Sequence, residues 1–580
     1  MRSATRVAVL VVAAHCVAGP GLVAPARAQE HVDGRALVEE YVRDRDAIAG
    51  FHGLALSQAA VARDIAYDDA WRRRLDALGP QPEAPVDDRV DLLLLSDLLE
   101  ERADERRDAA ARDAVAEPLV AFAPPLVALE EARRALEPVA PEDAAAALDT
   151  ARRAIEDLRR RADPNCKDAD ALKLPQVAVL RASRRAEALR QALAAWFRDR
   201  DGYEPDFAWW ARTPHAALDT ALRDYAVWLR ETVAGVKGDG ADAPIVGEPI
   251  GRDALLDALR HERIPYTPEE LIAIAEREMA WCDAEGVKAA QDLGLDGDWM
   301  RAVALVKDDH VAPGDMPRLV AEQAREAIAF VEERRLVTVP DLCKELWRLE
   351  MISADGQRTL PFAAYGGDKM LVAYPTESMS YESKLMSLRG NNRRFSRIVV
   401  PHELVPGHHL QLYQAARHHP WREAFRTPFL VEGWALYWET RLWELGWAQG
   451  AEDRVGMLFW RKHRCARVIV SLGYHLGTLS TEQMIEFLTT RVGLEKDGAT
   501  AEVRRYVGGG YGPLYQCAYL IGGLQLRALH RELVASGRMD ERTFHDAVLA
   551  QGSVPVEVIR SALTGEVPAP GTPPRWRFAD

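Results

Sequence analysis

Three histidines and a glutamate lie within eight positions of the chain, in the segment HELVPGHH at residues 402–409. Histidine is the commonest metal ligand among side chains, and a glutamate beside a ligating histidine can act as a general base. The segment therefore indicates a metal site with His402 as a ligand and Glu403 as the base. The alternative is the end of a polar helix whose histidines cap carbonyl groups or face solvent.

The spacing of these histidines differs from that of the short zinc-binding motif. In that motif two histidines four residues apart share one face of a helix, whereas this chain has Pro406 at the fourth position. On a regular helix His408 would be rotated about 240° from His402 and raised about 9 Å, and His409 would be raised about 10.5 Å. Neither could share with His402 an ion that needs nitrogen ligands at ~2.0–2.1 Å.

Pro406 and Gly407 give the helix a reason to break. Proline has no amide hydrogen for the carbonyl of His402 and its ring crowds that carbonyl, and glycine adopts backbone angles that are closed to other residues. A broken turn can bring a later histidine back toward His402. We favour His408 as the second ligand because it requires less extra chain to be absorbed, and His409 remains the alternative.

A third ligand is expected from the segment TPFLVEGWALYWE, in which Glu432 follows Pro428 in the first turn of an apolar helix. A carboxylate in such surroundings is costly to bury without a partner, and a cation would supply one. The alternative is a glutamate that faces the free amides of its own first helical turn. Glu439, two turns further on, is expected to be an acid behind the ligands or at the surface.

Several segments resemble a bacterial family of uncharacterised zincin-like proteins that carry the motif HExxPGHH. They are HELVPGHHLQ, FLVEGWALYWE, the pair Arg464 and Arg467 followed by Gly473 and His475, and EVRRYV with GPLYQCAYLIGG. The likeness extends over most of the mature chain, with its specific motifs between residues 400 and 525. That family is similar, more distantly, to thimet-type oligopeptidases and angiotensin-converting enzyme.

The resemblance implies a mainly helical, two-lobed molecule with a deep channel and one Zn²⁺ held by two histidines and a glutamate. Carried over by position, the ligands are His402, His408 and Glu432, and Glu403 is the base. It also implies a tyrosine that donates to the developing oxyanion, from the glycine- and tyrosine-rich residues 508–519.

Other residues are expected to contact the substrate. For the oxyanion donor Tyr519 is the first choice and Tyr511 and Tyr515 are the alternatives, although tyrosines at helical spacing more often serve packing. His475 could orient the substrate or relay a proton. If it is not a ligand, His409 would also belong to the substrate site.

Arg467 and Arg505 are candidates for holding a substrate carboxylate, because the guanidinium group matches a carboxylate in a two-pronged contact. Surface ion pairing explains an arginine equally well. If either residue binds a peptide C-terminus, the protein would be a carboxypeptidase rather than an oligopeptidase.

The elements that must position these residues are mostly helical. Residues 36–235 are rich in Ala, Leu, Arg and Glu with apolar residues three and four apart, which is typical of amphipathic helices. Thr267, followed by Pro-Glu-Glu, predicts a capped helix start. Residues 357–375 carry the β-branched, aromatic and glycine residues of a short hairpin. The sequence thus predicts a mainly α fold with one small β element next to the site.

A Gly-, Pro- and Asp-rich stretch at residues 233–253 is the candidate boundary between two lobes. It divides the chain into an N-terminal helical lobe at residues 29–250 and a catalytic helical lobe at residues 251–580 that carries the metal site.

The first 28 residues read as a cleaved secretory signal. Arg2 and Arg6 precede an apolar run, and Ala26-Arg27-Ala28 forms a small-x-small cleavage site. We therefore expect a periplasmic or secreted protein without stable membrane insertion, with a lipoprotein anchored at Cys16 as the alternative. The net charge of −15 argues against nucleic acid as a partner.

Together these features predict a secreted or periplasmic zinc-dependent peptidase. Glu403 would take a proton from a metal-activated water that attacks a small peptide or another small amide. The alternatives are a zinc hydrolase of a non-peptide amide or ester, and a catalytically silent helical binding protein.

Overall fold

The computed structural model describes residues 32–54, 56–238, 243–358, 360–508 and 510–579. The expected signal peptide, and Cys16 with it, lies outside the described residues. The chain is mainly helical, with 70% of residues in helices and 2% in strands. The predicted fold class, mainly α with a small β element, is confirmed.

Helices follow one another along almost the whole described chain. The N-terminal ones are α1 (Gly34–His52), α2 (Gln58–Leu78), α3 (Val86–Ala116), α4 (Ala123–Arg134), α5 (Pro141–Arg161), α6 (Gln176–Arg200) and α7 (Pro205–Trp228). The central ones are α8 (Arg252–His261), α9 (Pro268–Asp292), α10 (Trp299–Lys307), α11 (Met316–Glu333), α12 (Asp341–Leu346), α13 (Tyr381–Gly390), α14 (Arg393–Glu403), α15 (His408–His418) and α16 (Pro428–Glu444). The last are α17 (Ala451–His475), α18 (Thr481–Phe487), α19 (Lys496–Val507), α20 (Tyr515–His530), α21 (Glu541–Ala550) and α22 (Val556–Thr564).

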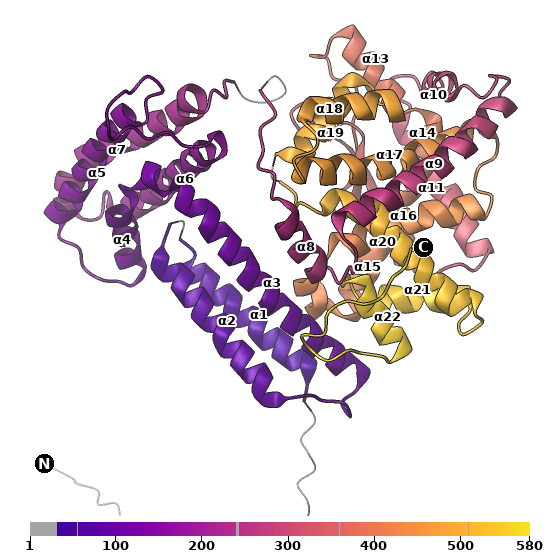
Figure 1. The fold of residues 1–580 in the computed structure, drawn as a ribbon, viewed down its shortest axis with the longest axis horizontal. Helices are drawn as coiled ribbons and strands as arrows, with labels where there is room; N and C mark the ends of the chain where they lie inside the picture. The colour runs from indigo at the N-terminus through magenta and orange to yellow at the C-terminus, as the bar shows by residue number, and fades with distance from the viewer. Residues whose placement is uncertain (1–31, 55, 239–242, 359, 509, 580) are drawn as a thin grey trace, which may run out of the picture.

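The N-terminal helices do not share a single hydrophobic core. Helices α4–α7 pack around their own core, which includes Leu148 and Leu222, and they stand apart from the C-terminal helices (Figure 1). Helix α1 and the first half of α3 instead pack, through residues such as Leu93, into a core with Trp434 and Phe544. The division into two lobes at residue 250 stays a prediction.

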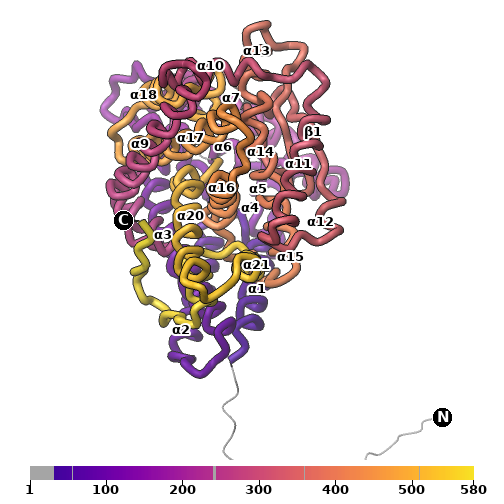
Figure 2. Tube along the Cα trace, turned by 90° about the vertical axis from the view of Figure 1, so that its right-hand side faces the viewer, coloured from indigo at the N-terminus to yellow at the C-terminus, as the bar shows by residue number. Residues whose placement is uncertain are grey.

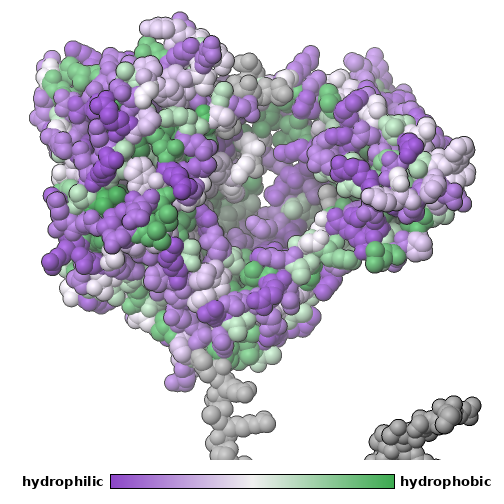
Figure 3. Space-filling view, turned by 180° about the vertical axis from the view of Figure 1, so that it is seen from behind, coloured by the Kyte–Doolittle hydropathy of each residue, from purple (hydrophilic) through white to green (hydrophobic). Residues whose placement is uncertain are grey.

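Helix α3 connects these two regions. It runs for 31 residues, from the second core to the core of α4–α7, which includes Ala116 at its last position. The space between α4–α7 and the C-terminal helices is a hollow that is open to solvent in the space-filling view (Figure 3).

The predicted hairpin is present and belongs to a three-stranded sheet. Strands β2 (Ala363–Tyr365) and β3 (Lys369–Val372) are antiparallel, with Ala364 opposite Leu371. Strand β1 (Arg348–Met351) lies parallel to β3, so the order is β1-β3-β2. The sequence analysis did not anticipate β1. The sheet places Tyr365, at the end of β2, against the histidines of α15.

Helices α16 and α20 lie side by side in the C-terminal core (Figure 2). Their close approach depends on glycines, because a Cβ added to Gly433 would lie 2.6 Å from Cα of Gly522. A Cβ on Gly522 would lie 1.9 Å from the carbonyl oxygen of Phe429. This crossing places Glu432 of α16 next to Tyr515 and Tyr519 of α20.

The described residues contain neither a disulfide nor a membrane-spanning helix. Cys166, Cys282, Cys343, Cys465 and Cys517 are free thiols. None of the helices in the described ranges has the length and the apolar character that crossing a bilayer requires.

Candidate metal centre

The helix breaks at the Pro-Gly step of the HELVPGHH segment. Helix α14 ends at Glu403 and α15 begins at His408. Between them, the amide of Gly407 donates to the carbonyl of Pro401 at 3.0 Å, and Nε1 of Trp434 donates to the carbonyl of Pro406 at 2.8 Å. A Cβ on Gly407 would lie 1.8 Å from the carbonyl oxygen of His402, so only glycine fits. The predicted distortion is present.

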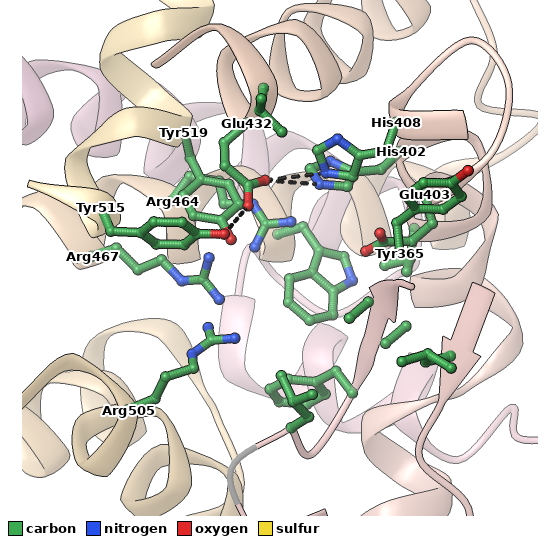
Figure 4. A pocket seen from close by; sticks show the side chains of 18 of the residues that line it. Tyr365, His402, Glu403, His408, Glu432, Arg464, Arg467, Arg505, Tyr515 and Tyr519 are labelled. Carbon is green, nitrogen blue, oxygen red and sulfur yellow. Dashed lines mark hydrogen bonds and ion pairs between the residues drawn. The ribbon is translucent and has the colours of Figure 1, made fainter. Parts of the chain in front are cut away.

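The break turns His408 back toward His402, and both face Glu432 of α16 (Figure 4). Nε2 of His408 lies 3.2 Å from Oε2 of Glu432, and Nε2 of His402 lies 3.7 Å from the same oxygen. The two imidazole rings are perpendicular, with centroids 4.8 Å apart. Ligand atoms that share a tetrahedral zinc at ~2.0–2.2 Å lie about 3.3 Å from one another. The two distances from the imidazole nitrogens to the carboxylate oxygen are close to this spacing.

Glu403 lies next to the two histidines. Its carboxylate and the ring nitrogens of His402 and His408 offer ligand atoms within 4.8 Å of one another. Two carboxylates thus face the histidines, and the 3.2 and 3.7 Å distances favour Glu432 as the ligand. Glu403 is then left beside the ligands, where a base belongs.

Other side chains hold the candidate ligands in place. Oε1 of Glu439 lies 2.7 Å from Nδ1 of His402, which directs Nε2 toward Glu432. The hydroxyl of Tyr515 donates to Oε1 of Glu432 at 2.5 Å. Oε2 of Glu432 is buried without a hydrogen-bond partner among the described residues. A buried carboxylate oxygen whose nearest polar neighbours are two imidazole nitrogens is suited to share a cation with them.

The charges at this point are strongly coupled. Burial disfavours the imidazolium, but the nearby carboxylates of Glu432 and Glu439 outweigh it and raise the pKa of His402 to about 9. Burial also opposes a charge on Glu432, yet His408 and His402 hold the pKa of Glu432 well below its usual range. A divalent cation held between these groups would take over the balancing of the Glu432 charge, because metal binding displaces protons from its ligands.

His409 points elsewhere. Its Nε2 lies 2.8 Å from the carbonyl oxygen of Cys343, and its Nδ1 lies 2.9 Å from the hydroxyl of Tyr365. Both ring nitrogens are therefore engaged away from Glu432. Of the two alternatives for the second histidine, the structure brings His408 to the cluster.

His475 is not brought to the cluster. It ends α17, eleven residues and ~16 Å of helix beyond Arg464. It lines a different cavity, with Tyr506 and Tyr511, on the side of the N-terminal helices. Burial there lowers the pKa of His475 to about 4. The expectation that His475 orients substrate or relays a proton at the metal cluster is thus not met by this geometry.

The cluster opens into a cavity of about 270 Å³ whose walls include the predicted tyrosines. The ring of Tyr519 stacks on His402 at 6.3 Å and 14°, whereas the hydroxyl of Tyr515 is already bonded to Glu432. Tyr511 lies further out, 37% exposed, with its ring 4.3 Å from that of Tyr515. Tyr519 thus lies against the candidate ligand His402, and its hydroxyl, unlike that of Tyr515, is not bonded to Glu432.

Three arginines form the opposite wall (Figure 4). Arg464 and Arg467 come from α17 and Arg505 comes from α19, and all three line the cavity. The sequence analysis anticipated Arg467 and Arg505 but gave Arg464 no role. It also missed Tyr365 and Glu502, which line the cavity from β2 and α19. A period of three or four between arginines was the only available signal, and it does not tell a cavity wall from an exposed helix face.

A second cavity of about 670 Å³ adjoins the first, because Glu432 and Tyr515 line both. Its outer wall is acidic. The carboxylates come from α3 and from the end of α8: Glu101, Asp104, Glu105, Asp108, Asp257 and Glu262. We call this the acidic vestibule.

Comparison with known protein families shows to which family the chain belongs. Residues 54–563 match the family described as "Bacterial protein of unknown function (DUF885)". The chain belongs to this family. Its match spans α2 to α22 and therefore includes the candidate metal centre, but the family description assigns no activity. No curated protein matches the chain.

Two solved structures share the fold. One, a candidate lipoprotein of unknown function from Shewanella oneidensis, superposes with a TM-score of 0.68 at 17% identity over 92% of this chain and 100% of that one. The other, a candidate lipoprotein from Colwellia psychrerythraea, gives a TM-score of 0.51 at 17% identity over 76% of this chain and 75% of that one. At this identity the likeness concerns the fold alone.

Proposed function

We propose that the protein is a zinc-dependent peptidase that acts on small peptides. The observation that carries the proposal is the convergence of His402 and His408, from two helices, on Oε2 of Glu432 from a third, at distances close to those between zinc ligands. Glu403 beside them supplies the base, and Glu439 behind His402 supplies the carboxylate that often orients a ligating histidine.

A bound zinc ion would supply a Lewis acid and would lower the pKa of a water molecule toward neutrality. Glu403 then takes the proton from the attacking water and delivers it to the leaving amine. Tyr519, stacked on His402, donates to the oxyanion as it forms. Removal of one such donor costs about 3 kcal/mol in other enzymes.

Two features favour a peptide over other amides and esters. The arginine wall can receive a carboxylate, and Glu105 and Asp108 in the acidic vestibule can receive an ammonium group, which are the two charges of a short peptide. The N-terminal sequence supports a periplasmic or secreted location, and the descriptions of the two structural relatives as candidate lipoproteins agree with export.

The metal content of the purified protein tests the centre. We expect one zinc per chain by elemental analysis, and a loss of zinc in His402→Ala, His408→Ala and Glu432→Ala. The control His409→Ala should keep its zinc, because His409 is bonded to Tyr365 and Cys343. Zinc retained in His408→Ala but lost in His409→Ala would overturn the ligand set.

A digest of a peptide library, read by mass spectrometry, tests the activity. We expect cleavage by the zinc-loaded protein and none after chelation. If peptides stay intact while another amide or ester is hydrolysed, the protein is a hydrolase of a different class and not a peptidase. A protein that binds no zinc and cleaves nothing would be a binding protein.

A further inference from the structure

The arginine wall carries more positive charge than its partners use. Glu502 is the shared partner of Arg467, at 2.8 Å, and of Arg505, at 2.9 and 3.0 Å. Among the described residues, the carboxylate that Arg464 contacts is Glu439, at a long 3.4 Å, and Glu439 is itself bonded to His402. Three guanidinium groups therefore depend on two carboxylates.

These guanidinium groups are buried. The side chains of Arg464, Arg467 and Arg505 are 6%, 4% and 10% exposed. Buried charges are expected to be paired and hydrogen-bonded. Yet Nη1 of Arg467 and the Nε atoms of Arg464 and Arg505 are buried with no partner among the described residues. All three side chains also line the cavity, where an anion would balance their excess charge.

The wall is also rigid. The Nε of Arg467 donates to the hydroxyl of Tyr506 at 3.0 Å, and the same hydroxyl donates to Glu502. Burial disfavours the carboxylate of Glu502, but Arg467 and Arg505 hold the pKa of Glu502 well below its usual range. Glu502 thus remains charged and fixes both guanidinium groups, which suits them to bind a planar carboxylate.

The distance from this wall to the metal cluster is short. Cζ of Arg467 lies 4.5 Å from the ring centre of Tyr519, and that ring lies 6.3 Å from the ring of His402. One tyrosine ring therefore separates the guanidinium from a candidate ligand. An extended chain advances ~3.3–3.6 Å per residue, so only one or two residues fit between a bond at the metal and a carboxylate at Arg467.

We propose that Arg467 and Arg505 bind the C-terminal carboxylate of the substrate, so that the protein is a carboxypeptidase that releases one amino acid or one dipeptide. This inference rests on the proposed peptidase function for its cleavage step. The carboxylate site itself is a property of the arginine wall and can be tested without turnover. The rest of the substrate then extends past Glu432 and Tyr515 into the acidic vestibule.

Binding is measured first, on the full chain carrying Glu403→Gln so that no peptide is consumed, with and without zinc. The probes are a tetra-alanine peptide with a free C-terminus, its C-terminal amide, and an amide whose last residue is Glu. We expect the free acid to bind about 100-fold more tightly than its amide, as for the loss of a two-pronged charged contact. Equal binding of acid and amide overturns the proposal, and tight binding of the Glu amide overturns the C-terminal assignment.

Arg505→Met is the matched variant, because Glu502 keeps its bond to Arg467 when Arg505 is replaced. It should abolish the preference for the free acid, and Arg505→Lys should restore part of it. The control Arg454→Met removes a partly exposed arginine at the start of α17 that pairs with Asp292 and lines neither cavity, and it should keep the preference. A preference that survives in a folded Arg505→Met protein contradicts the assignment.

The wild-type enzyme is then incubated with the same peptides, and its products are sequenced by mass spectrometry. We expect release of one or two residues from the free acid and cleavage of the amide reduced about 100-fold. Internal cleavage that leaves longer C-terminal fragments contradicts the proposal that the protein is a carboxypeptidase. Selective binding without any hydrolysis would refute the proposed peptidase function while supporting the carboxylate site.

Discussion

His402 is positioned by the carboxylate behind it as much as by its own helix. Oε1 of Glu439 contacts Nδ1 of His402 at 2.7 Å, and both side chains are buried. Such a contact fixes the orientation of the ring and raises the basicity of a metal-binding nitrogen. The position of Glu439 behind the candidate ligand agrees with the expectation from the sequence.

Glu439→Gln should therefore weaken zinc binding by about 10- to 100-fold without abolishing it. Competition with a chromogenic chelator measures the affinity. Glu444→Gln, at the end of the same helix where Glu444 pairs with Arg441 and Arg527, is the control and should bind zinc as the wild type does. Unchanged zinc affinity in Glu439→Gln would show that the contact plays no part in metal binding.

Glu403 is assigned a different role from that of the ligands. Glu403→Gln should retain stoichiometric zinc and the fold but lower kcat about 10²- to 10⁴-fold, because the amide cannot accept the proton of water. Zinc analysis and peptide turnover are measured on the same preparation. Loss of zinc would make Glu403 a ligand, and full turnover would end its role as the base.

At the scale of elements, the site depends on the interruption between α14 and α15. The interruption lets two histidines six residues apart face one carboxylate, which a regular helix forbids. The backbone of Gly407 lies against the carbonyl group of His402. Any side chain at position 407 would collide with that carbonyl, so glycine permits this geometry.

Gly407→Ala should therefore displace the turn and lose zinc. A methyl group 1.8 Å from a carbonyl oxygen cannot be accommodated without a backbone shift, and we expect a loss of stability of about 2–4 kcal/mol. Chemical denaturation and zinc analysis measure the two effects. Gly50→Ala is the control, because an added Cβ there meets nothing within 4 Å and should be neutral or stabilising.

At the scale of the whole molecule, the vestibule joins α3 and α8 to the helix that carries Glu432. Oγ1 of Thr427, the capping residue of α16, donates to Oε2 of Glu262 at 2.5 Å. Burial raises the pKa of Glu262 to about 8. Burial also raises the pKa of Glu101 in the same wall to about 7, together with the charges of Glu105 and Asp97.

A glutamate with a raised pKa makes stability fall as the pH rises. Between the unfolded value near 4.5 and the folded value of about 8, the folded chain holds a proton on Glu262 that the unfolded chain has released. Stability from this group is thus present below pH 4.5 and lost as the pH passes 8. Glu262→Gln should remove this loss.

We expect Glu262→Gln to be about 1–2 kcal/mol more stable than the wild type at pH 8 and equal to it near pH 4.5; the gain is small because the carboxyl keeps contact with water in the vestibule. Urea unfolding at a series of pH values measures the difference, and Glu566→Gln at the exposed C-terminal end is the control. A difference that is the same at every pH would exclude a proton on Glu262 as its cause.

Features that depend on neighbours in the chain were predictable from the sequence. The capping box at Thr267 is present as predicted, and the hairpin within residues 357–375 forms. The helix breaks at Pro406 and Gly407 because proline lacks an amide and glycine alone fits against the carbonyl of His402. These outcomes follow from backbone sterics and local hydrogen bonds.

Only the tertiary structure decided which side chains meet. His408 rather than His409 faces Glu432 because Trp434 holds the turn at Pro406 while Tyr365 and Cys343 hold His409. The shared charge of the arginine wall depends on the packing of α17 against α20 and on the bond from Arg467 of α17 to Glu502 of α19. The length of α17 places His475 at a different cavity. Contacts between residues far apart in sequence set these relations, and no local pattern encodes them.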